Sequence, residues 1–364
     1  MNKRKMMGVA AMAVAAMTIT TVGEPTSSLT NAETRHLFKI IRRLKSEGRS
    51  IIYISHKLEE LFEISDEITV MRDGTYVGQY PIEEISIDEL IKLMVGRSME
   101  NRFPPNEHVV QPNVLLKVEN FTSADPHSFK GVSFDLHKGE ILGIGGLVGA
   151  QRTELVESVF GLRSIAEGKL YKNGQEIVNS NPQEAIKNGF AMLTEERRAT
   201  GIIPMLSVMD NTLAVAFKAM AGNRFGILNP KKLQTDVEKI NGELNVKTPS
   251  VKTAIQNLSG GNQQKVLICR WLLANSDILI LDEPTRGIDV GAKYEIYRIM
   301  RELTKAGKSI IMVSSEMPEL IGVSDRIMVM CEGRMTGILD AAEVEQTDVM
   351  TLATQSENKA KAVD

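Results

Sequence analysis

The sequence predicts an α/β protein with one complete copy of a domain, preceded by the C-terminal half of a second copy. Three observations lead to this prediction. Helix-like and strand-like segments alternate along the 364 residues, a long stretch repeats without a gap, and a glycine-rich loop joins a strand-like segment to a helix-like one. Because strands that alternate with helices tend to pair in parallel, we expect a largely parallel sheet covered by helices.

An internal repeat relates residues 24–74 to residues 283–333 at a constant offset of 259 residues. Both stretches begin with Glu-Pro-Thr and end with an acidic residue followed by glycine, and no insertion interrupts the match. Chance does not produce an ungapped match of this length, so the chain carries two copies of one fold.

Each copy contains the same predicted elements in the same order. An amphipathic helix ends at a glycine, a short apolar strand follows, and a further helix and strand lead to a turn. The first helix is expected at 33–45 and 294–305, the first strand at 51–54 and 310–313, and the turn at 73–74 and 332–333. Only the second copy extends upstream, where strands are expected at 114–119 and 132–136 before the glycine-rich loop.

Composition and the repeat divide the chain into five parts. The stretch between the two copies is polar and contains prolines, which is typical of a linker. The parts are an atypical N-terminal segment at 1–22, the C-terminal part of the first copy at 23–100, the linker at 101–112, the complete second copy at 113–355 and a polar tail at 356–364.

The overall composition excludes several classes of protein. The chain has 43 lysine and arginine residues against 46 aspartate and glutamate residues, and its net charge of −3 does not fit a strongly basic nucleic-acid binder. An apolar fraction of 43% is high enough to form buried cores, which argues against disorder. Two cysteines, Cys269 and Cys331, cannot build a disulfide framework and indicate a reducing compartment.

The glycine-rich loop, residues 146–153, occupies the place of a phosphate-binding loop with the pattern GxxxxGK[ST]. Such a loop points backbone N–H groups at phosphate oxygens beside a helix N-terminus. Gly146 and Gly149 supply the glycines, while Gln151 and Arg152 replace the second motif glycine and the lysine. Arg152 keeps a positive charge, and Thr153 keeps the hydroxyl that contacts Mg²⁺ in this motif. A plain glycine turn is the alternative interpretation of this loop.

Two adjacent carboxylates, Asp282 and Glu283, follow an apolar strand-like run at 278–281. A strand that ends in two acids places both of them at a sheet edge. Asp282 can hold Mg²⁺ through water, and Glu283 can orient or deprotonate an attacking water molecule. The predicted metal site therefore combines Thr153 and Asp282.

The segments LSGGNQQK at 258–265 and LDEPTRGIDVGAK at 281–293 resemble the motifs of ATP-binding cassette (ABC) ATPases. From Glu24 to about Ala353 the chain is similar to the double-cassette ATPases of bacterial sugar importers, and the galactose/methyl-galactoside type looks closest. The resemblance implies a P-loop NTPase (ABC ATPase) fold, with one complete cassette preceded by the C-terminal half of another. It does not specify the sugar, and ribose or xylose are the alternatives.

The resemblance also implies roles for further residues. The signature segment would contact the γ-phosphate of ATP bound on the opposite cassette, and it comprises Leu258, Ser259, Gly260, Gly261 and Gln263. Asp289 resembles the residue that couples the two sites. Glu195 stands where the family has a glutamine that senses Mg²⁺ and the membrane subunit, so it either binds metal or is a solvated charge.

His56 matches the switch histidine that contacts the γ-phosphate in the family, and a structural histidine is the alternative. Its counterpart in the second copy is Ser315, which has no cationic form, so the second site should be slow. In the first copy, Glu24 remains from the acidic pair, but Gly23 replaces the aspartate that corresponds to Asp282. The resemblance thus implies a catalytic set of Glu283, His56 and Ser315.

The resemblance implies ATP and Mg²⁺ as cofactors and a location on the cytoplasmic face of the bacterial inner membrane. The expected partners are transmembrane permease subunits, a periplasmic sugar-binding protein acting indirectly, and a second cassette or another copy of the ATPase, but no nucleic acid. Residues 1–22 have the basic start and apolar stretch of a signal peptide. A secreted half-ATPase would lack ATP, so we interpret them as a truncated gene start, with an export signal as the alternative.

Two hypotheses about function remain open at this point. The first is an ATPase subunit that powers sugar import by in-line attack of water on the γ-phosphate. The second is a truncated nucleotide-binding module with little hydrolysis of its own.

Overall fold

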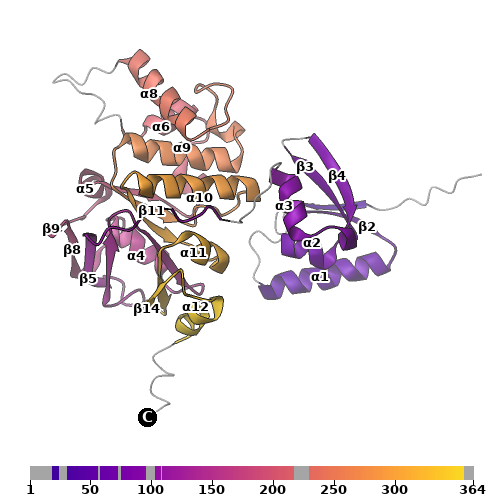
Figure 1. Ribbon diagram of the computed structural model, residues 1–364, viewed down its shortest axis with the longest axis horizontal. Coiled ribbons are helices and arrows are strands. Elements are labelled where there is room, and N and C mark those ends of the chain that lie inside the picture. Colours follow the sequence, from indigo (N-terminus) through magenta and orange to yellow (C-terminus); the bar gives the residue numbers. More distant parts are fainter. Residues whose placement is uncertain are drawn as a thin grey trace, which may run out of the picture. The chain divides into compact units, whose positions relative to one another are not determined.

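The computed structural model describes residues 19–23, 31–55, 58–72, 75–95, 103–107, 109–216 and 229–355. The chain splits into two compact units, unit 1 from Met1 to Met99 and unit 2 from Glu100 to Asp364 (Figure 1). Each unit is described by itself. In the described part of the chain, the structure contains no helix with the length and apolar character needed to cross a membrane.

Unit 1 contains two small sheets packed with helices. Strands β1 and β2 pair in parallel, β3 and β4 form an antiparallel pair, and Leu61, Ile68, Val70, Ile85 and Leu90 form a buried core. The elements are β1 (Ile19–Gly23), α1 (Asn31–Ser46), β2 (Ser50–Ile54), α2 (Leu58–Ile64), β3 (Glu67–Arg72), β4 (Thr75–Pro81), the short 3-10 helix Ile82–Glu84 and α3 (Ile87–Val95).

The first half of unit 2 supplies a complete antiparallel sheet and two strands of a second sheet. The elements are β5 (Val114–Ser123), β6 (Val132–His137), β7 (Ile141–Gly146), α4 (Arg152–Val159), β8 (Ile165–Lys172), β9 (Gln175–Ile177), α5 (Pro182–Lys187), β10 (Phe190–Leu193), the π-helical turn Arg197–Gly201 and α6 (Val208–Leu213). Strands β6, β5, β8 and β9 form a four-stranded antiparallel sheet in that order.

The second half of unit 2 completes the main sheet. The elements are α8 (Pro230–Glu243), the short 3-10 helix Ile255–Asn257, α9 (Gly260–Leu273), β11 (Ile278–Asp282), α10 (Val290–Lys305), β12 (Ser309–Val313), α11 (Met317–Val323), β13 (Arg326–Cys331), β14 (Arg334–Asp340) and α12 (Gln346–Ala353). The six-stranded sheet has the order β10-β11-β12-β7-β13-β14, and all its pairs are parallel except β13–β14.

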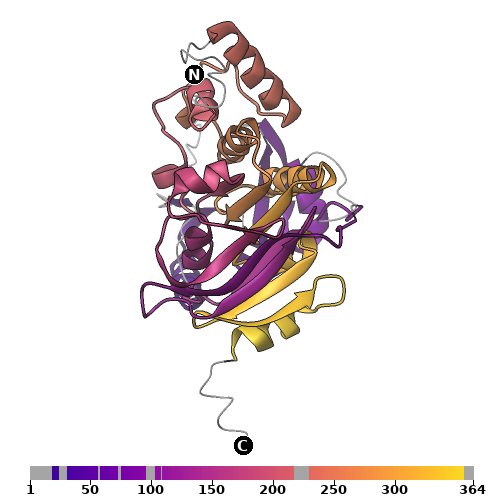
Figure 2. The same cartoon turned by 90° about the vertical axis from the view of Figure 1, so that its left-hand side faces the viewer.

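The central strands of this sheet are apolar because both of their faces are covered. Every residue of β7, β11 and β12 is buried, as expected for a parallel sheet between layers of other elements. Figures 1 and 2 show α6 and α8 at one end of unit 2 and α12 at the opposite end. Asp282, the last residue of β11, is therefore buried and its carboxylate is desolvated.

The predicted repeat is confirmed by the secondary structure of the two units. Elements β1 to β4 of unit 1 and β11 to β14 of unit 2 have bounds that differ by 259 residues, and so do α1 and α10, and α2 and α11. The β3–β4 register shifts between Val70 and Met71, and the β13–β14 register shifts at the matching Val329 and Met330. The predicted helices and strands agree with the observed ones to within four residues at each end. The turn at 73–74 lies outside the described residues.

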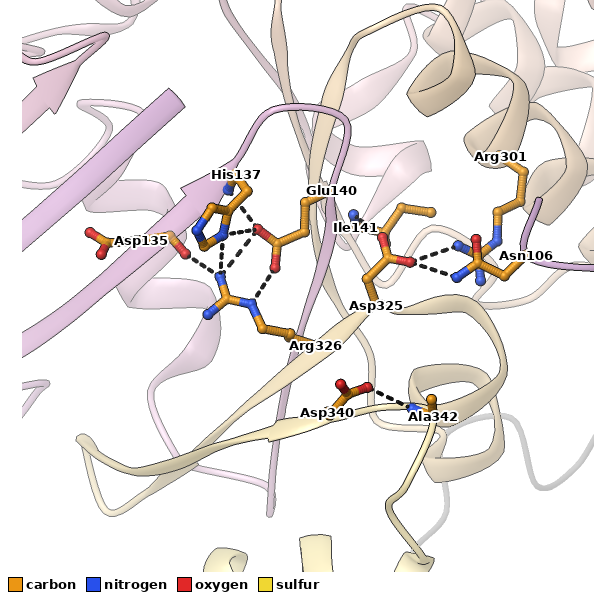
Figure 3. A network of polar contacts seen from close by, with 10 residues as sticks. All are labelled: Asn106, Asp135, His137, Glu140, Ile141, Arg301, Asp325, Arg326, Asp340 and Ala342. Atoms are coloured by element: carbon orange, nitrogen blue, oxygen red, sulfur yellow. Dashed lines mark hydrogen bonds and ion pairs between the residues drawn. The ribbon is translucent and has the colours of Figure 1, made fainter. Parts of the chain in front are cut away.

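A buried polar network joins the start of β13 to the start of β7 in unit 2 (Figure 3). Glu140, which is fully buried, accepts a hydrogen bond from the Nε of Arg326 at 2.7 Å and contacts His137. Asp325 accepts from the Nη1 of Arg301 at 3.2 Å and from the backbone N–H of Ile141 at 2.8 Å. Each buried charge in this network has an opposite charge beside it, as burial requires.

Candidate functional site

The glycine-rich loop connects β7 to α4 in a strained backbone conformation. Gly146 has a φ of +150°, and a side chain there would place its Cβ 2.4 Å from the carbonyl oxygen of Met330. Gly149 has a φ of +85° within the loop. Gln151, immediately before α4, has a φ of +68°, in the left-handed region that favours glycine. The backbone at this position therefore keeps the left-handed conformation that suits the glycine of the motif, although the residue is glutamine.

Hydrogen bonds of the Gln151 side chain support this unusual conformation. Its Oε1 accepts a hydrogen bond from the hydroxyl of Ser128 at 2.9 Å, and its Nε2 donates to the carbonyl of Gly149 at 3.2 Å. The side chain is thus held against the loop and its neighbour. Holding a non-glycine residue at positive φ costs free energy, which the two hydrogen bonds help to offset.

Arg152 and Thr153, the first residues of α4, contact the ends of the two neighbouring strands. The Nη1 of Arg152 donates to the carbonyl of Ser314 at 2.7 Å, and its Nη2 lies 3.9 Å from the Oε1 of Glu283. The hydroxyl of Thr153 donates to the Oδ2 of Asp282 at 2.8 Å. The structure therefore brings the predicted loop and both predicted carboxylates into one site.

Burial dominates the electrostatics of Asp282 and Glu283. It raises the pKa of Asp282 to about 6 and that of Glu283 to about 7, and in both cases the charge of Arg152 opposes the rise. Ser315 donates a hydrogen bond to the Oε2 of Glu283 at 3.1 Å. Glu283 also has a φ of +46°. Two acids with raised pKa values in one site are typical of functional positions.

The oxygen atoms at this site fit a magnesium ion. Asp282 is 1% exposed, and its Oδ1 is buried without a hydrogen-bond partner, while its Oδ2 is bonded to the Thr153 hydroxyl. A buried carboxylate oxygen without a partner is costly, and a bound cation would satisfy it. Carboxylate and hydroxyl oxygens are also the ligand type that Mg²⁺ prefers. Among the described residues, no cluster of three histidine, cysteine or acidic side chains offers a site of a different kind.

Glu195 lies on the segment that follows β10, and its carboxylate forms an ion pair with Arg286. Arg286 comes three residues after Glu283, in the turn before Asp289. The pairing partly neutralises the negative charge that would repel phosphate at this position. No sequence motif predicts this ion pair, because 91 positions separate Glu195 and Arg286 in the chain.

The signature segment forms the start of α9. Ser259 stands at the N-cap position without a side-chain capping hydrogen bond, Leu258 packs against the core, and Gln263 donates to the carbonyls of Ile255 and Leu258. Beside this segment, Arg197 donates to Gln263. The helix N-terminus therefore presents backbone N–H groups that can bind an anion.

Glycines in the signature segment allow close packing with α10. A Cβ on Gly261 would lie 2.4 Å from the Cβ of Ala292, and one on Gly260 would lie 2.8 Å from the Nη2 of Arg197. Asp289 caps α10 by accepting a hydrogen bond from the N–H of Ala292 at 2.9 Å. Asp289 and the signature segment are thus linked through the first turn of α10. His56 and Glu24 lie outside the described residues.

Glu319 is a buried acid beside the site, and none of the sequence motifs predicts it. It is 1% exposed and accepts hydrogen bonds from the hydroxyls of Thr285, at 2.7 Å, and Ser314. Burial raises its pKa. It therefore connects the turn after Glu283 to the residue before Ser315. The repeat carried a signal for it, because Glu60 occupies the same position in unit 1 and accepts from Tyr53 at 2.7 Å.

We expect Glu283→Gln to stabilise the metal-free protein at pH 8 but not at pH 4.5. The pKa of Glu283 is about 7 in the folded state against an ordinary value of 4.5, so the folded state loses stability as pH rises through this window. The variant removes a cost of at most about 3 kcal/mol. Urea unfolding with EDTA, followed by the fluorescence of Trp271, measures the difference. An equal difference at both pH values would contradict the assignment.

A cavity of about 580 Å³ lies beside the network of Figure 3 and not at the site above. Its lining includes Asn106, His137, Arg301 and Asp340. Asp340 is engaged in the local turn, where it accepts a hydrogen bond from the N–H of Ala342 at 3.0 Å. The lining contains none of the residues that the sequence predicted for nucleotide binding.

Comparison with known proteins agrees with this arrangement. A family model described as "ABC transporter" matches residues 129–286. The galactose/methyl galactoside import ATP-binding protein MglA of Clostridium tetani is 57% identical over 337 residues, which cover 93% of this chain and 66% of that protein. Its namesake in Sodalis glossinidius is 51% identical, with 92% of this chain and 66% of that protein covered. The chain therefore spans slightly less than two thirds of the length of these relatives.

Solved structures share the fold of unit 2. A nucleotide-free ATP-binding cassette from an ABC transporter has a TM-score of 0.56 at 18% identity and covers 69% of this chain and 99% of its own. The protein cbiO1 from Clostridium perfringens has a TM-score of 0.55 at 21% identity, with 69% and 98% covered. Together with the family model and the relatives, this likeness confirms the predicted P-loop NTPase fold. The chain belongs to the ATP-binding cassette proteins of ABC transporters.

Proposed function

We propose that this chain binds ATP and hydrolyses it to drive the import of galactose or methyl galactoside into a bacterial cell. One observation carries the catalytic part. Thr153 and Arg152, at the end of the glycine-rich loop, lie against Asp282 and Glu283 at the end of β11. The relatives carry the sugar part, since both Clostridium tetani and Sodalis glossinidius proteins are named for galactose and methyl galactoside import.

Each residue of this site has a role in the proposed reaction. Backbone N–H groups of the glycine-rich loop would bind the phosphates of ATP at the start of α4, and the Arg152 guanidinium would add positive charge. The Thr153 hydroxyl and the Asp282 carboxylate would hold Mg²⁺, which neutralises charge on the phosphates. Glu283 would accept a proton from the attacking water, and Ser315 would orient the Glu283 carboxylate through their hydrogen bond.

The proposed partners follow from the proposed activity. An importer needs permease subunits in the inner membrane and, indirectly, a periplasmic protein that delivers the sugar, and the ATPase would lie on the cytoplasmic face. The signature segment contacts Arg197 and the first turn of α10 rather than the glycine-rich loop. It is therefore available for ATP bound on another cassette, either a second copy of this chain or a separate one.

Slow or absent hydrolysis is the second candidate, and one observation favours it. Arg152 is bonded to the carbonyl of Ser314 and lies beside Glu283, so its charge is engaged before any nucleotide binds. A nucleotide would have to displace at least one of these contacts. A chain with this arrangement binds ATP but turns it over slowly.

Phosphate release by the purified chain separates the two candidates. Release with Mg-ATP above that of the Glu283→Gln variant supports the enzyme, while ATP binding without release supports the module. The sugar is tested in vesicles that contain the permease subunits of a galactose importer. Uptake of methyl galactoside that requires this chain supports the proposal, and uptake of ribose or xylose in its place contradicts it.

Asp282→Asn is expected to remove the effect of Mg²⁺ on ATP binding. The variant keeps the volume of the side chain but loses the negative charge that would hold the metal, so we expect binding of Mg-ATP to weaken by roughly tenfold or more. Binding of metal-free ATP should not weaken. Isothermal titration with and without Mg²⁺ measures both. Asp277→Asn, at a half-exposed position just before β11, is the control and should leave both affinities unchanged.

A further inference from the structure

A single buried carboxylate, that of Glu319, connects the two chain segments that carry Glu283 and Ser315. Its Oε1 accepts a hydrogen bond from the hydroxyl of Thr285 at 2.7 Å, and its Oε2 accepts one from the hydroxyl of Ser314. Thr285 lies two residues after Glu283, and Ser314 lies immediately before Ser315. The side chains of Glu319, Thr285 and Ser314 belong to residues that are each at most 1% exposed. They therefore form a connection between the two segments that solvent does not reach.

The backbone of Glu283 needs support from its surroundings. Its φ of +46° lies in the left-handed region, and a residue with a side chain stays there only where neighbouring contacts fix it. The N–H of Glu283 donates to the carbonyl of Val313 at 2.9 Å, and the carbonyl of Glu283 accepts from the N–H of Arg286 at 3.2 Å. Thr285, whose hydroxyl is bonded to Glu319, lies inside the turn that the second of these bonds closes. Glu319 therefore helps to fix the turn that holds Glu283 in its unusual conformation.

The segment around Ser315 depends on the same carboxylate. The Ser314 hydroxyl donates to Glu319 and also accepts from the N–H of Glu316 at 3.1 Å, so its bonds fix the backbone on both sides of Ser315. Ser315 in turn donates to the Oε2 of Glu283 at 3.1 Å. Glu319 thus influences both partners of this last hydrogen bond, one through each of its oxygen atoms.

Stability of the fold does not by itself account for an acid at this position. Both hydrogen-bond donors to Glu319 are neutral hydroxyls, and burial raises its pKa. A buried carboxylate whose partners are neutral is less favourable than an apolar side chain of similar size. Proteins retain such groups mainly where they serve a functional site.

Unit 1 contains the same pair of an acid and a serine. Glu60 and Ser55 stand at the repeat positions of Glu319 and Ser314, and the Oγ of Ser55 donates to the Oε2 of Glu60 at 3.4 Å. Glu60 is 9% exposed. The residue that follows Ser55 in the sequence is His56, at the switch position. The acid–serine pair therefore accompanies the switch position in both copies of the repeat.

We propose that Glu319 is a positioning residue, which holds Glu283 and Ser315 in the relative arrangement that hydrolysis requires through its bonds to Thr285 and Ser314. Glu319 acts through these neighbours and does not itself contact the reacting atoms. Its effect on catalysis rests on the proposed function, whereas its effect on the two segments does not. Because small displacements of a reacting group lower rates steeply, the loss of these bonds should be visible in turnover.

Glu319→Leu is the variant that tests the effect on turnover. Leucine has a similar volume but accepts no hydrogen bond, so we expect kcat for ATP hydrolysis to fall about 10- to 100-fold while the KM for ATP changes by less than about threefold. Glu319→Gln can still bond to both hydroxyls and should keep kcat within about threefold of the parent. A role in folding alone would lower the yield of folded protein and leave kcat of the folded fraction unchanged.

Two further pairs of variants serve as a second route and as a control. If Glu319→Leu does not fold, Thr285→Val removes one of the two bonds without changing the shape of the side chain, and Thr285→Ser restores the hydroxyl. We expect kcat to fall in the valine variant and to recover in the serine variant. Glu316→Gln changes an acid of the same loop that is 46% exposed and paired with Lys293, so it should leave kcat unchanged.

Hydrogen exchange with mass spectrometry tests the positioning without turnover. In Glu319→Leu we expect peptides that cover residues 283–288 and 314–318 to exchange at least about tenfold faster than in the parent, while β7 and α9 exchange as before. If the parent releases no phosphate, the proposed function fails and this comparison alone decides the role of Glu319. The proposal is overturned by unchanged exchange in both segments, by faster exchange throughout unit 2, or by a Glu319→Leu variant that keeps the kcat of an active parent.

Discussion

Glu283→Gln is expected to reduce ATP hydrolysis by about 10²- to 10⁴-fold, the range typical of losing a general base. The glutamine keeps the shape of the side chain and can still accept a hydrogen bond from Ser315, but it cannot accept a proton. Because Glu283 contacts Arg152 at 3.9 Å and no backbone of the glycine-rich loop, ATP binding should remain within a few-fold. Phosphate release and equilibrium binding of ATP, measured on the same preparation, check the two halves of this expectation.

Glu316→Gln is the matched control for this loss. Glu316 lies next to Ser315, pairs with Lys293 and is 46% exposed, so it shares the loop but not the buried site. We expect hydrolysis by this variant to equal that of the parent. If Glu283→Gln and the parent release phosphate at the same rate, Glu283 is not the base and the site binds nucleotide without turning it over by this route.

Several residues of the site could be predicted because each group of them comes shortly after one predicted strand. Asp282 and Glu283 come directly after an apolar run, and Thr153 follows a glycine-rich loop, so both segments were expected at the end of a buried strand. Which side chains meet there depends on tertiary packing. The motifs placed Thr153 and Asp282 in one predicted metal site across 129 positions, but the contact of Arg152 with Ser314 spans 162 positions and matches no motif. No local pattern encodes such pairs.

Three features of the site could not be predicted from residue preferences. A glutamine with a φ of +68° is not expected from its type, and only the motif register of Gln151 indicated a special backbone. Glu319 could not be distinguished by sequence from an ordinary charged residue of a helix, although its repeat partner Glu60 is also buried. The pairing of Glu195 with Arg286 depends on how the segment after β10 lies against the turn after β11, which propensity does not determine.

The fold was predicted best where the repeat supplied a second copy of the evidence. The helices at 31–46 and 290–305 and the strands at 50–54 and 309–313 agree with the expected ranges. Only two strands of the antiparallel sheet, β5 and β6, were predicted. Strands β8 and β9 were not, since β8 begins with exposed residues and β9 is only three residues long. Alternation of helix and strand indicated the parallel sheet but contained no information about this second one.

Asp325→Ala is expected to destabilise unit 2 by about 3–5 kcal/mol, the range for removing one partner of a buried ion pair. Asp325 accepts from Arg301 at 3.2 Å, from Asn106 at 2.8 Å and from the N–H of Ile141 at 2.8 Å (Figure 3). Its removal leaves the Arg301 guanidinium, 4% exposed, without its counter-charge, and leaves the N–H that begins β7 without an acceptor. Urea unfolding followed by the buried Trp271, the single tryptophan of the chain, reports on unit 2 alone.

The repeat provides a control at the equivalent position of unit 1. Asp66 corresponds to Asp325, but its side chain is 74% exposed and its partner is Lys45, so Asp66→Ala should cost at most about 1 kcal/mol and leave the Trp271 transition unchanged. Replacing both members of the buried pair, Asp325→Ala with Arg301→Met, should recover part of the loss, because no unpaired charge then remains inside. If the single variant at Asp325 unfolds at the parent's midpoint, the pair contributes nothing, and the start of β7 is held by sheet packing alone.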